Sequence, residues 1–152
     1  MFSTVRYFIK TGIIFLILGL LTGLYMSVHT NIIAIGYGPE LLSAHTHVIL
    51  VGSVMMIIMG VALWFFPRPE KDDKRYNPNI ISLTYWVMTI STLLRFLSQV
   101  IASFEEIKTV RFLITIFSFF QIVAIILFFY TIWGRIRSSG GSRIREQKGE
   151  KF

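Results

Sequence analysis

The chain has 152 residues, 54% of them hydrophobic, and its mean hydropathy is +0.66. Such a composition is atypical of a water-soluble domain, and the absence of cysteine excludes a disulfide framework and a thiolate metal site. The net charge of +7 could indicate nucleic-acid binding. The basic residues gather at the ends of apolar segments instead, so no nucleic-acid partner is expected.

Four apolar segments are long enough to cross a bilayer, which takes about 18 consecutive apolar residues or more. They lie at roughly 8–29, 41–66, 79–103 and 112–134. Because the connections are short, consecutive helices should run antiparallel. We predict an all-α integral membrane protein: an up-down bundle of four transmembrane helices in one domain over residues 1–137, with a polar, basic tail over 138–152.

The first segment carries small residues at every fourth position, Gly19, Gly23 and Ser27. Such strips let helix backbones approach closely in lipid. Helix packing within the chain and an interface between two copies explain this strip equally well. A homo-oligomer is expected. The apolar run is too long for a signal peptide, and no small-residue cleavage site follows it, so this segment is interpreted as a retained anchor.

The second segment begins with Ala44-His45-Thr46-His47, which places two imidazoles where hydrocarbon should surround them. Titratable groups inside a membrane span are costly and usually bind or relay something. Without cysteine, histidine is the one strong soft-metal or heme-iron ligand that the chain has. His29 ends the first segment near the same surface, and the two motif histidines should lie roughly 7–11 Å inside it.

The third segment places Arg95 about 14 Å below that surface, with Gln99 one turn closer to it. Arg95, Gln99, His45 and His47 are therefore expected in one layer. An arginine inside a span normally has a partner, and a heme propionate would suit it, because guanidinium binds carboxylates in bidentate fashion. Pairing with Glu105 or Glu106, or contact with a lipid phosphate, is the alternative.

Positions two apart on an α-helix point about 200° apart, so the two motif histidines should face opposite sides. His45 shares its face with Gly52, Met56 and Gly60, which suggests a trough of small residues for a flat macrocycle. We therefore favour His45 as the ligand. His47 would serve a neighbouring subunit or hydrogen-bond behind the ligand, and His29 would meet water or act as a second axial ligand.

The basic residues divide unevenly between the two ends of the predicted bundle. Twelve lie at or before the start of the first segment, between the second and third, or after the fourth, against two, Lys108 and Arg111, at the opposite end. By the positive-inside rule both termini are cytoplasmic, and the basic tail should contact anionic lipid. We expect a multi-pass protein of a prokaryotic cytoplasmic (inner) membrane.

The stretch His45-Thr46-His47-Val48-Ile49-Leu50, with Gly60 and then Trp64-Phe65-Phe66-Pro67, resembles the second helix of subunit I in the heme–copper oxidase superfamily. The likeness is to the nitric oxide reductases and C-family cytochrome oxidases, and it covers about 25 residues. It implies that His45 is an axial ligand of a low-spin heme. The whole chain is also similar to small four-helix membrane proteins described as subunit-I-like.

The chain is about a third as long as subunit I and lacks the helices that carry the second low-spin ligand and the copper ligands. Oxygen or nitric oxide reduction by this chain alone is therefore not expected. The favoured function is a membrane protein that binds heme b for electron transfer or gas sensing. One alternative is a non-catalytic accessory subunit of a respiratory complex, with the histidines as packing or proton-relay groups.

A further alternative is a copper or zinc site formed by His29, His45 and His47, although their spacing makes one shared centre awkward. Independent catalysis is not expected, because the apolar segments hold no carboxylate and nothing resembles a nucleophile with a paired base.

Overall fold

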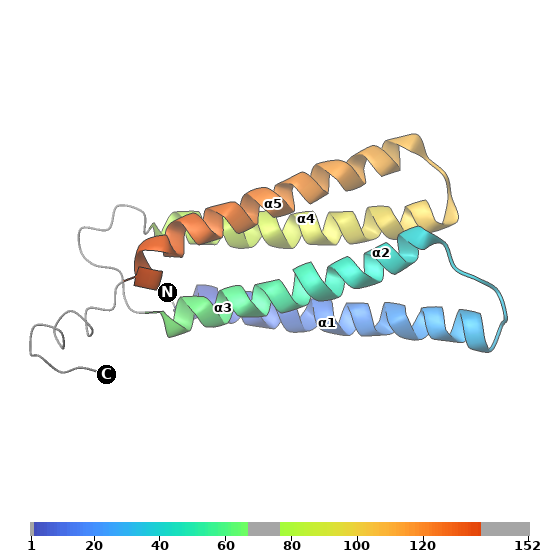
Figure 1. Ribbon diagram of the computed structural model, residues 1–152, viewed down its shortest axis with the longest axis horizontal. Coiled ribbons are helices and arrows are strands. Elements are labelled where there is room, and N and C mark those ends of the chain that lie inside the picture. The colour runs from blue at the N-terminus through green and yellow to red at the C-terminus, as the bar shows by residue number, and fades with distance from the viewer. Residues whose placement is uncertain (1, 67–76, 138–152) are drawn as a thin grey trace, which may run out of the picture.

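The computed structural model describes residues 2–66 and 77–137, and all of its regular structure is helical. Figure 1 shows the helices side by side, with the chain reversing direction at each connection. The elements are α1 (Phe2–Asn31), α2 (Pro39–His47), the π-helix η1 (Val48–Met55), α3 (Met56–Phe65), α4 (Pro78–Phe104) and α5 (Lys108–Arg137). The segments α2, η1 and α3 follow one another without a break and form one long helix.

This arrangement confirms the prediction of an all-α protein with four helices long and apolar enough to cross a membrane. The connections 32–38 and 105–107 lie at one end, which we call the outer end because of the charge distribution. The sidedness of the termini stays a prediction. The basic connection 67–76 and the predicted tail 138–152 fall outside the described residues.

Local sequence signals fix where the helices begin and end. Pro39 and Pro78 occupy the first helical positions of α2 and α4, where a missing backbone N–H costs nothing. The side chain of Asn77 accepts a 2.9 Å hydrogen bond from the backbone N–H of Asn79 and so caps α4. At the outer turn, Arg111 and Glu106 form an exposed salt bridge of 2.9 Å.

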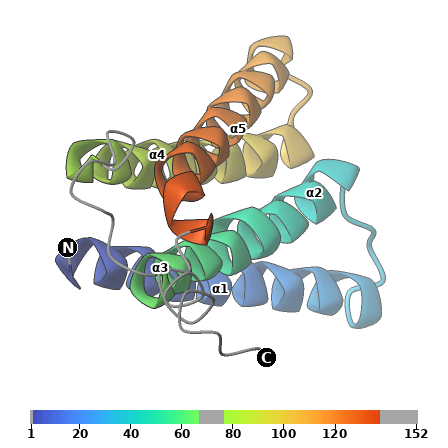
Figure 2. The same ribbon diagram turned by 60° about the vertical axis from the view of Figure 1, so that its left-hand side comes forward.

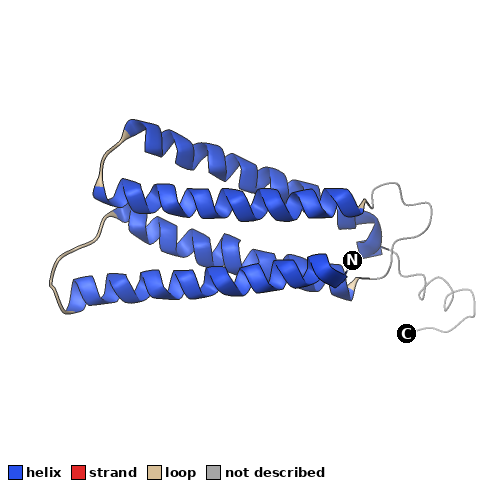
Figure 3. Ribbon diagram, turned by 180° about the vertical axis from the view of Figure 1, so that it is seen from behind, coloured by secondary structure: helices blue, strands red, loops and turns tan. Residues whose placement is uncertain are grey.

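The helices pack in two pairs that meet along the middle of the bundle. One pair is α1 with η1 and α3, and the other is α4 with α5; α2 and η1 join the pairs by packing on α4. Seen from two sides, α1 lies below the second long helix and α5 flanks α4 (Figure 2, Figure 3). The shared core is apolar, and among its most buried members are Phe8, Phe15, Met56, Met88 and Phe128.

Two members of the strip of small residues on α1, Gly19 and Gly23, pack within the chain, whereas Ser27 is exposed. A Cβ atom at Gly23 would lie 2.8 Å from Cε1 of His45, and one at Gly19 would collide with Ile49. Gly12 faces Ser53 and Ile57 in the same way. These glycines let α1 approach the second long helix closely, so Gly19 and Gly23 serve packing within the chain; the predicted homo-oligomer stays a prediction.

The π-helix η1 was not predicted. Its wider turn follows His47 directly and contains Gly52, and π-helical segments are rare and frequent near functional sites. The prediction that His45 shares a face with Gly52 assumed α-helical rotation throughout. That assumption is wrong after Val48, because the rotation per residue changes there.

Arg135 was grouped with the basic residues that follow the last span, but it lies within α5 and is 2% exposed. Its Nη2 donates to the carbonyl oxygens of Leu63 at 3.1 Å and Phe66 at 2.8 Å. A cation is favourable at these carbonyls, because they end α3 and carry the negative end of its dipole. Arg135 therefore ties the inner end of α5 to the end of α3.

Replacing Gly52 tests the close packing at the centre of the bundle. A Cβ atom there would lie 2.8 Å from Cγ2 of Thr92 and 3.2 Å from the ring of Phe15. Gly52→Leu should therefore lower the free energy of unfolding by about 1–3 kcal/mol, measured by denaturation in mixed detergent micelles.

The matched control is Gly36→Leu, because a Cβ atom at Gly36 meets nothing within 4 Å. It should change stability by no more than about 0.5 kcal/mol. Equal effects at the two positions would contradict the packing described for Gly52.

Candidate functional site

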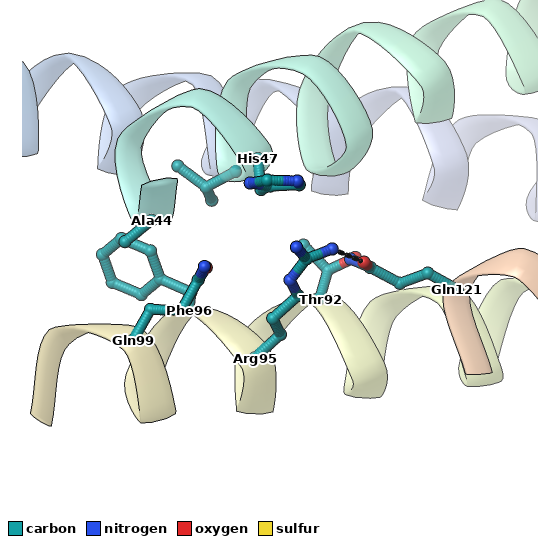
Figure 4. A pocket seen from close by; sticks show the side chains of 8 residues that line it. Ala44, His47, Thr92, Arg95, Phe96, Gln99 and Gln121 are labelled. Atoms are coloured by element: carbon teal, nitrogen blue, oxygen red, sulfur yellow. Dashed lines mark hydrogen bonds between the residues drawn. The ribbon is translucent and has the colours of Figure 1, made fainter. Parts of the chain in front are cut away.

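Polar side chains converge between α2 and α4 in the outer half of the bundle, although hydrocarbon should surround these helices. Figure 4 shows His47 facing the guanidinium of Arg95 across this space, with Gln99 beside them and Gln121 reaching in from α5. The lining residues are Ala44, His47, Val48, Thr92, Arg95, Phe96, Gln99 and Gln121. We call this set the polar layer.

Arg95 is held by amides rather than by a carboxylate. Its Nη1 donates to Oε1 of Gln121 at 2.7 Å, and Nε2 of Gln121 donates to the hydroxyl of Thr92 at 2.9 Å. The predicted pairing with Glu105 or Glu106 is not found, since Glu106 binds Arg111. Arg95 thus extends toward α5 and the middle of the bundle.

A second hydrogen-bonded chain joins α4 to α2. Nε2 of Gln99 donates to the hydroxyl of Ser43 at 2.7 Å, and Ser43 lies one turn before His47. Nδ1 of His47 is 2.8 Å from the carbonyl oxygen of Ser43. Because a carbonyl oxygen only accepts, Nδ1 carries the proton and Nε2 of the neutral ring is left without one.

His45 points the other way, toward α1. Its Nδ1 lies 2.9 Å from the carbonyl oxygen of Gly19, so here too Nδ1 donates and Nε2 bears the lone pair. The ring lies against Gly23, where a larger side chain would displace it. Nε2 of His45 forms no hydrogen bond with any described residue, and the protein does not fully enclose this atom.

His29 contacts neither His45 nor His47 among the described interactions. Its ring stacks against Tyr25 in a tilted arrangement, with centroids 4.8 Å apart. Its Nδ1 is enclosed without a hydrogen-bond partner in the described part of the chain.

The three histidines therefore do not form the shared copper or zinc centre that was considered. Within residues 2–66 and 77–137, no group of three or more histidine or acidic side chains could hold a metal ion. The structure gives the copper and zinc alternative no support.

The polar layer does not accommodate a heme. The space between its side chains is too narrow even for a water-sized sphere. The predicted trough at Gly52 is filled by Phe15 from α1 and Thr92 from α4. A macrocycle bound to His45 would have to lie outside the bundle.

Helical geometry correctly predicted that His45 and His47 face opposite sides, but not which one faces Arg95. The structure brings His47, Arg95 and Gln99 together and places His45 on the α1 side. Sequence reasoning missed Gln121, although an amide in the middle of an apolar segment was a usable signal. Ser43 and Thr92 were missed because single hydroxyls are common in spans.

No known protein family, characterised protein or solved structure matches this chain. The likeness of the His45 segment to oxidase subunit I therefore rests on the quoted residues alone.

Replacing Gln121 tests the polar layer. Gln121→Leu removes the acceptor of Arg95 and the donor to Thr92 and leaves buried groups unsatisfied. It should lower the free energy of unfolding by about 1–3 kcal/mol, measured as for Gly52→Leu. Ser118→Ala is the control on the same helix, because Ser118 bonds only the carbonyl of Ile114. A Gln121→Leu protein as stable as the control would argue against the Arg95–Gln121 bond.

Proposed function

We propose that this multi-pass membrane protein supplies His45 as one axial ligand of a b-type heme at the α1–α2 surface, for electron transfer or gas sensing. One observation carries the proposal: the Gly19 carbonyl holds Nδ1 of His45 and leaves Nε2 unpartnered. Metal-ligating histidines almost always donate their other ring nitrogen in this way, which fixes the tautomer and the ring orientation. The resemblance to oxidase subunit I points to the same residue.

A bound heme needs an axial ligand and space for its macrocycle, and the chain meets only the first of these needs. His45 suits an axial ligand, but neither the polar layer nor the position at Gly52 has room for the macrocycle. The proposed heme is therefore shared with a second chain, which covers its far face and supplies any second ligand. When bound, the heme would supply one-electron chemistry or a gas-binding iron; the Gly19 carbonyl of this chain orients the imidazole.

The structure favours no role for Arg95 at this heme, because His45 faces α1 whereas Arg95 lies in the polar layer with His47. His29 as second ligand also has no support in the described contacts. The proposed location, a prokaryotic cytoplasmic membrane, rests on the charge distribution and on the resemblance.

The accessory-subunit function is the second candidate, and the part-buried hydrogen bond from His47 to the carbonyl oxygen of Ser43 favours it. In that case both histidines pack and join helices, and the protein binds no cofactor of its own.

The visible spectrum of the detergent-purified protein, oxidised and then reduced with dithionite, distinguishes these functions. A sharp α-band after reduction is expected for low-spin heme. His45→Ala should abolish it, and His47→Ala should retain it. A colourless protein after expression with ample heme would contradict the proposal and favour the accessory function.

Gly23 gives a second test of the same orientation. Gly23→Val places a side chain where the ring of His45 lies, so it should reduce the heme content several-fold at unchanged helicity. The control, Gly36→Val, has no contact with any imidazole and should bind heme as wild type does. Full heme content in Gly23→Val would exclude His45 in this orientation as the ligand.

A further inference from the structure

The guanidinium of Arg95 lacks a counter-charge within the described spans. Glu40 is the one acidic residue in the described helices, and it lies in the first turn of α2 near the outer end. No salt bridge joins Glu40 to Arg95 among the described residues. A charge inside a membrane span is costly and normally paired.

The depth of Arg95 argues against neutralisation by lipid headgroups. Arg95 lies nine residues before the outer end of α4, about 14 Å along the helix. Its acceptor Gln121 lies thirteen residues into α5, about 20 Å from the same end. Because the hydrocarbon core is about 30 Å thick, the side chain points toward the middle of the bilayer and away from outer phosphates.

The hydrogen bonds of Arg95 leave one edge of the guanidinium without a partner. Gln121 takes Nη1. Nε is enclosed and unpartnered, and Nη2 forms no hydrogen bond with a described residue and is not enclosed. Because Nε is enclosed, a carboxylate that approaches from outside meets Nη2, where its hydrogen bond would be charge-assisted.

A second copy of this chain cannot supply a carboxylate at that depth. Glu40, Glu105 and Glu106 lie at the outer end, and the other acidic residues lie in sequence outside the four spans. The anionic group must come from a different molecule that reaches the bilayer interior beside α4. The span that carries Gln121, α5, is the least buried of the four, with 17% of its most apolar window buried.

We infer that Arg95 is the docking point for a carboxylate on a transmembrane helix of a different protein. The side chain of a partner Asp or Glu would approach through Nη2, and its helix would lie against the exposed apolar surface of the bundle. This inference is independent of the proposed heme, since His45 faces the opposite side of α2.

A synthetic transmembrane helix of leucine and alanine with a single central Glu is a suitable probe. Its association with the full chain in phosphatidylcholine vesicles at pH 8 can be measured by energy transfer between fluorescent labels. The Glu helix should bind about tenfold more tightly than an otherwise identical Gln helix. Arg95→Gln should remove this preference, and Arg95→Lys should retain part of it.

Arg111→Gln is the matched control, because it removes a cation that is already paired with Glu106 at the outer surface, and it should keep the tenfold preference. Circular dichroism checks that each variant is folded. Equal binding of the two helices to wild type, or a preference that survives Arg95→Gln, would overturn the inference. Loss of the preference when phosphatidylglycerol is added would also overturn it, in favour of an anionic lipid at Arg95.

Discussion

A polar group in the hydrocarbon core needs a partner inside the protein, because lipid tails offer none. The outer half of this bundle meets that constraint with bonds between helices. Gln99 bonds Ser43 across α4 and α2, Arg95 bonds Gln121 across α4 and α5, and His45 bonds Gly19 across α2 and α1. These three bonds join all four long helices in the outer half of the bundle, so the arrangement of the helices depends on them.

Small residues make the His45 contact possible. Gly19 and Gly23 bring α1 so close to the second long helix that the imidazole reaches a backbone carbonyl. The same close approach closes the space in which a macrocycle was expected, since Phe15 occupies the position beside Gly52. One packing feature therefore orients the imidazole of His45 and leaves no room for a macrocycle beside Gly52.

The spans were predictable because apolar length alone identifies them, and the opposite orientation of His45 and His47 followed from helical periodicity. Which imidazole meets Arg95 was not predictable, because it depends on the order in which helices pack around α2 and on the π-helical turn at Val48. The use of Gly19 and Gly23 was equally undecided, since a small-residue strip looks the same whether its partner is in the chain or in a second copy. Arg135 shows the same limit: its sequence position suggests a surface cation, and only tertiary contact shows that it caps α3.

The central claim is that α1 holds His45 with Nδ1 protonated and Nε2 free to bind iron. Solid-state ¹⁵N NMR of the histidine-labelled protein in lipid, with His45 assigned by substitution, measures this directly. The account predicts a neutral ring with a protonated Nδ1 and a bare Nε2 in the heme-free protein, and a change at Nε2 of His45 when heme is added. A ring protonated at Nε2, or a change confined to His47, would contradict it.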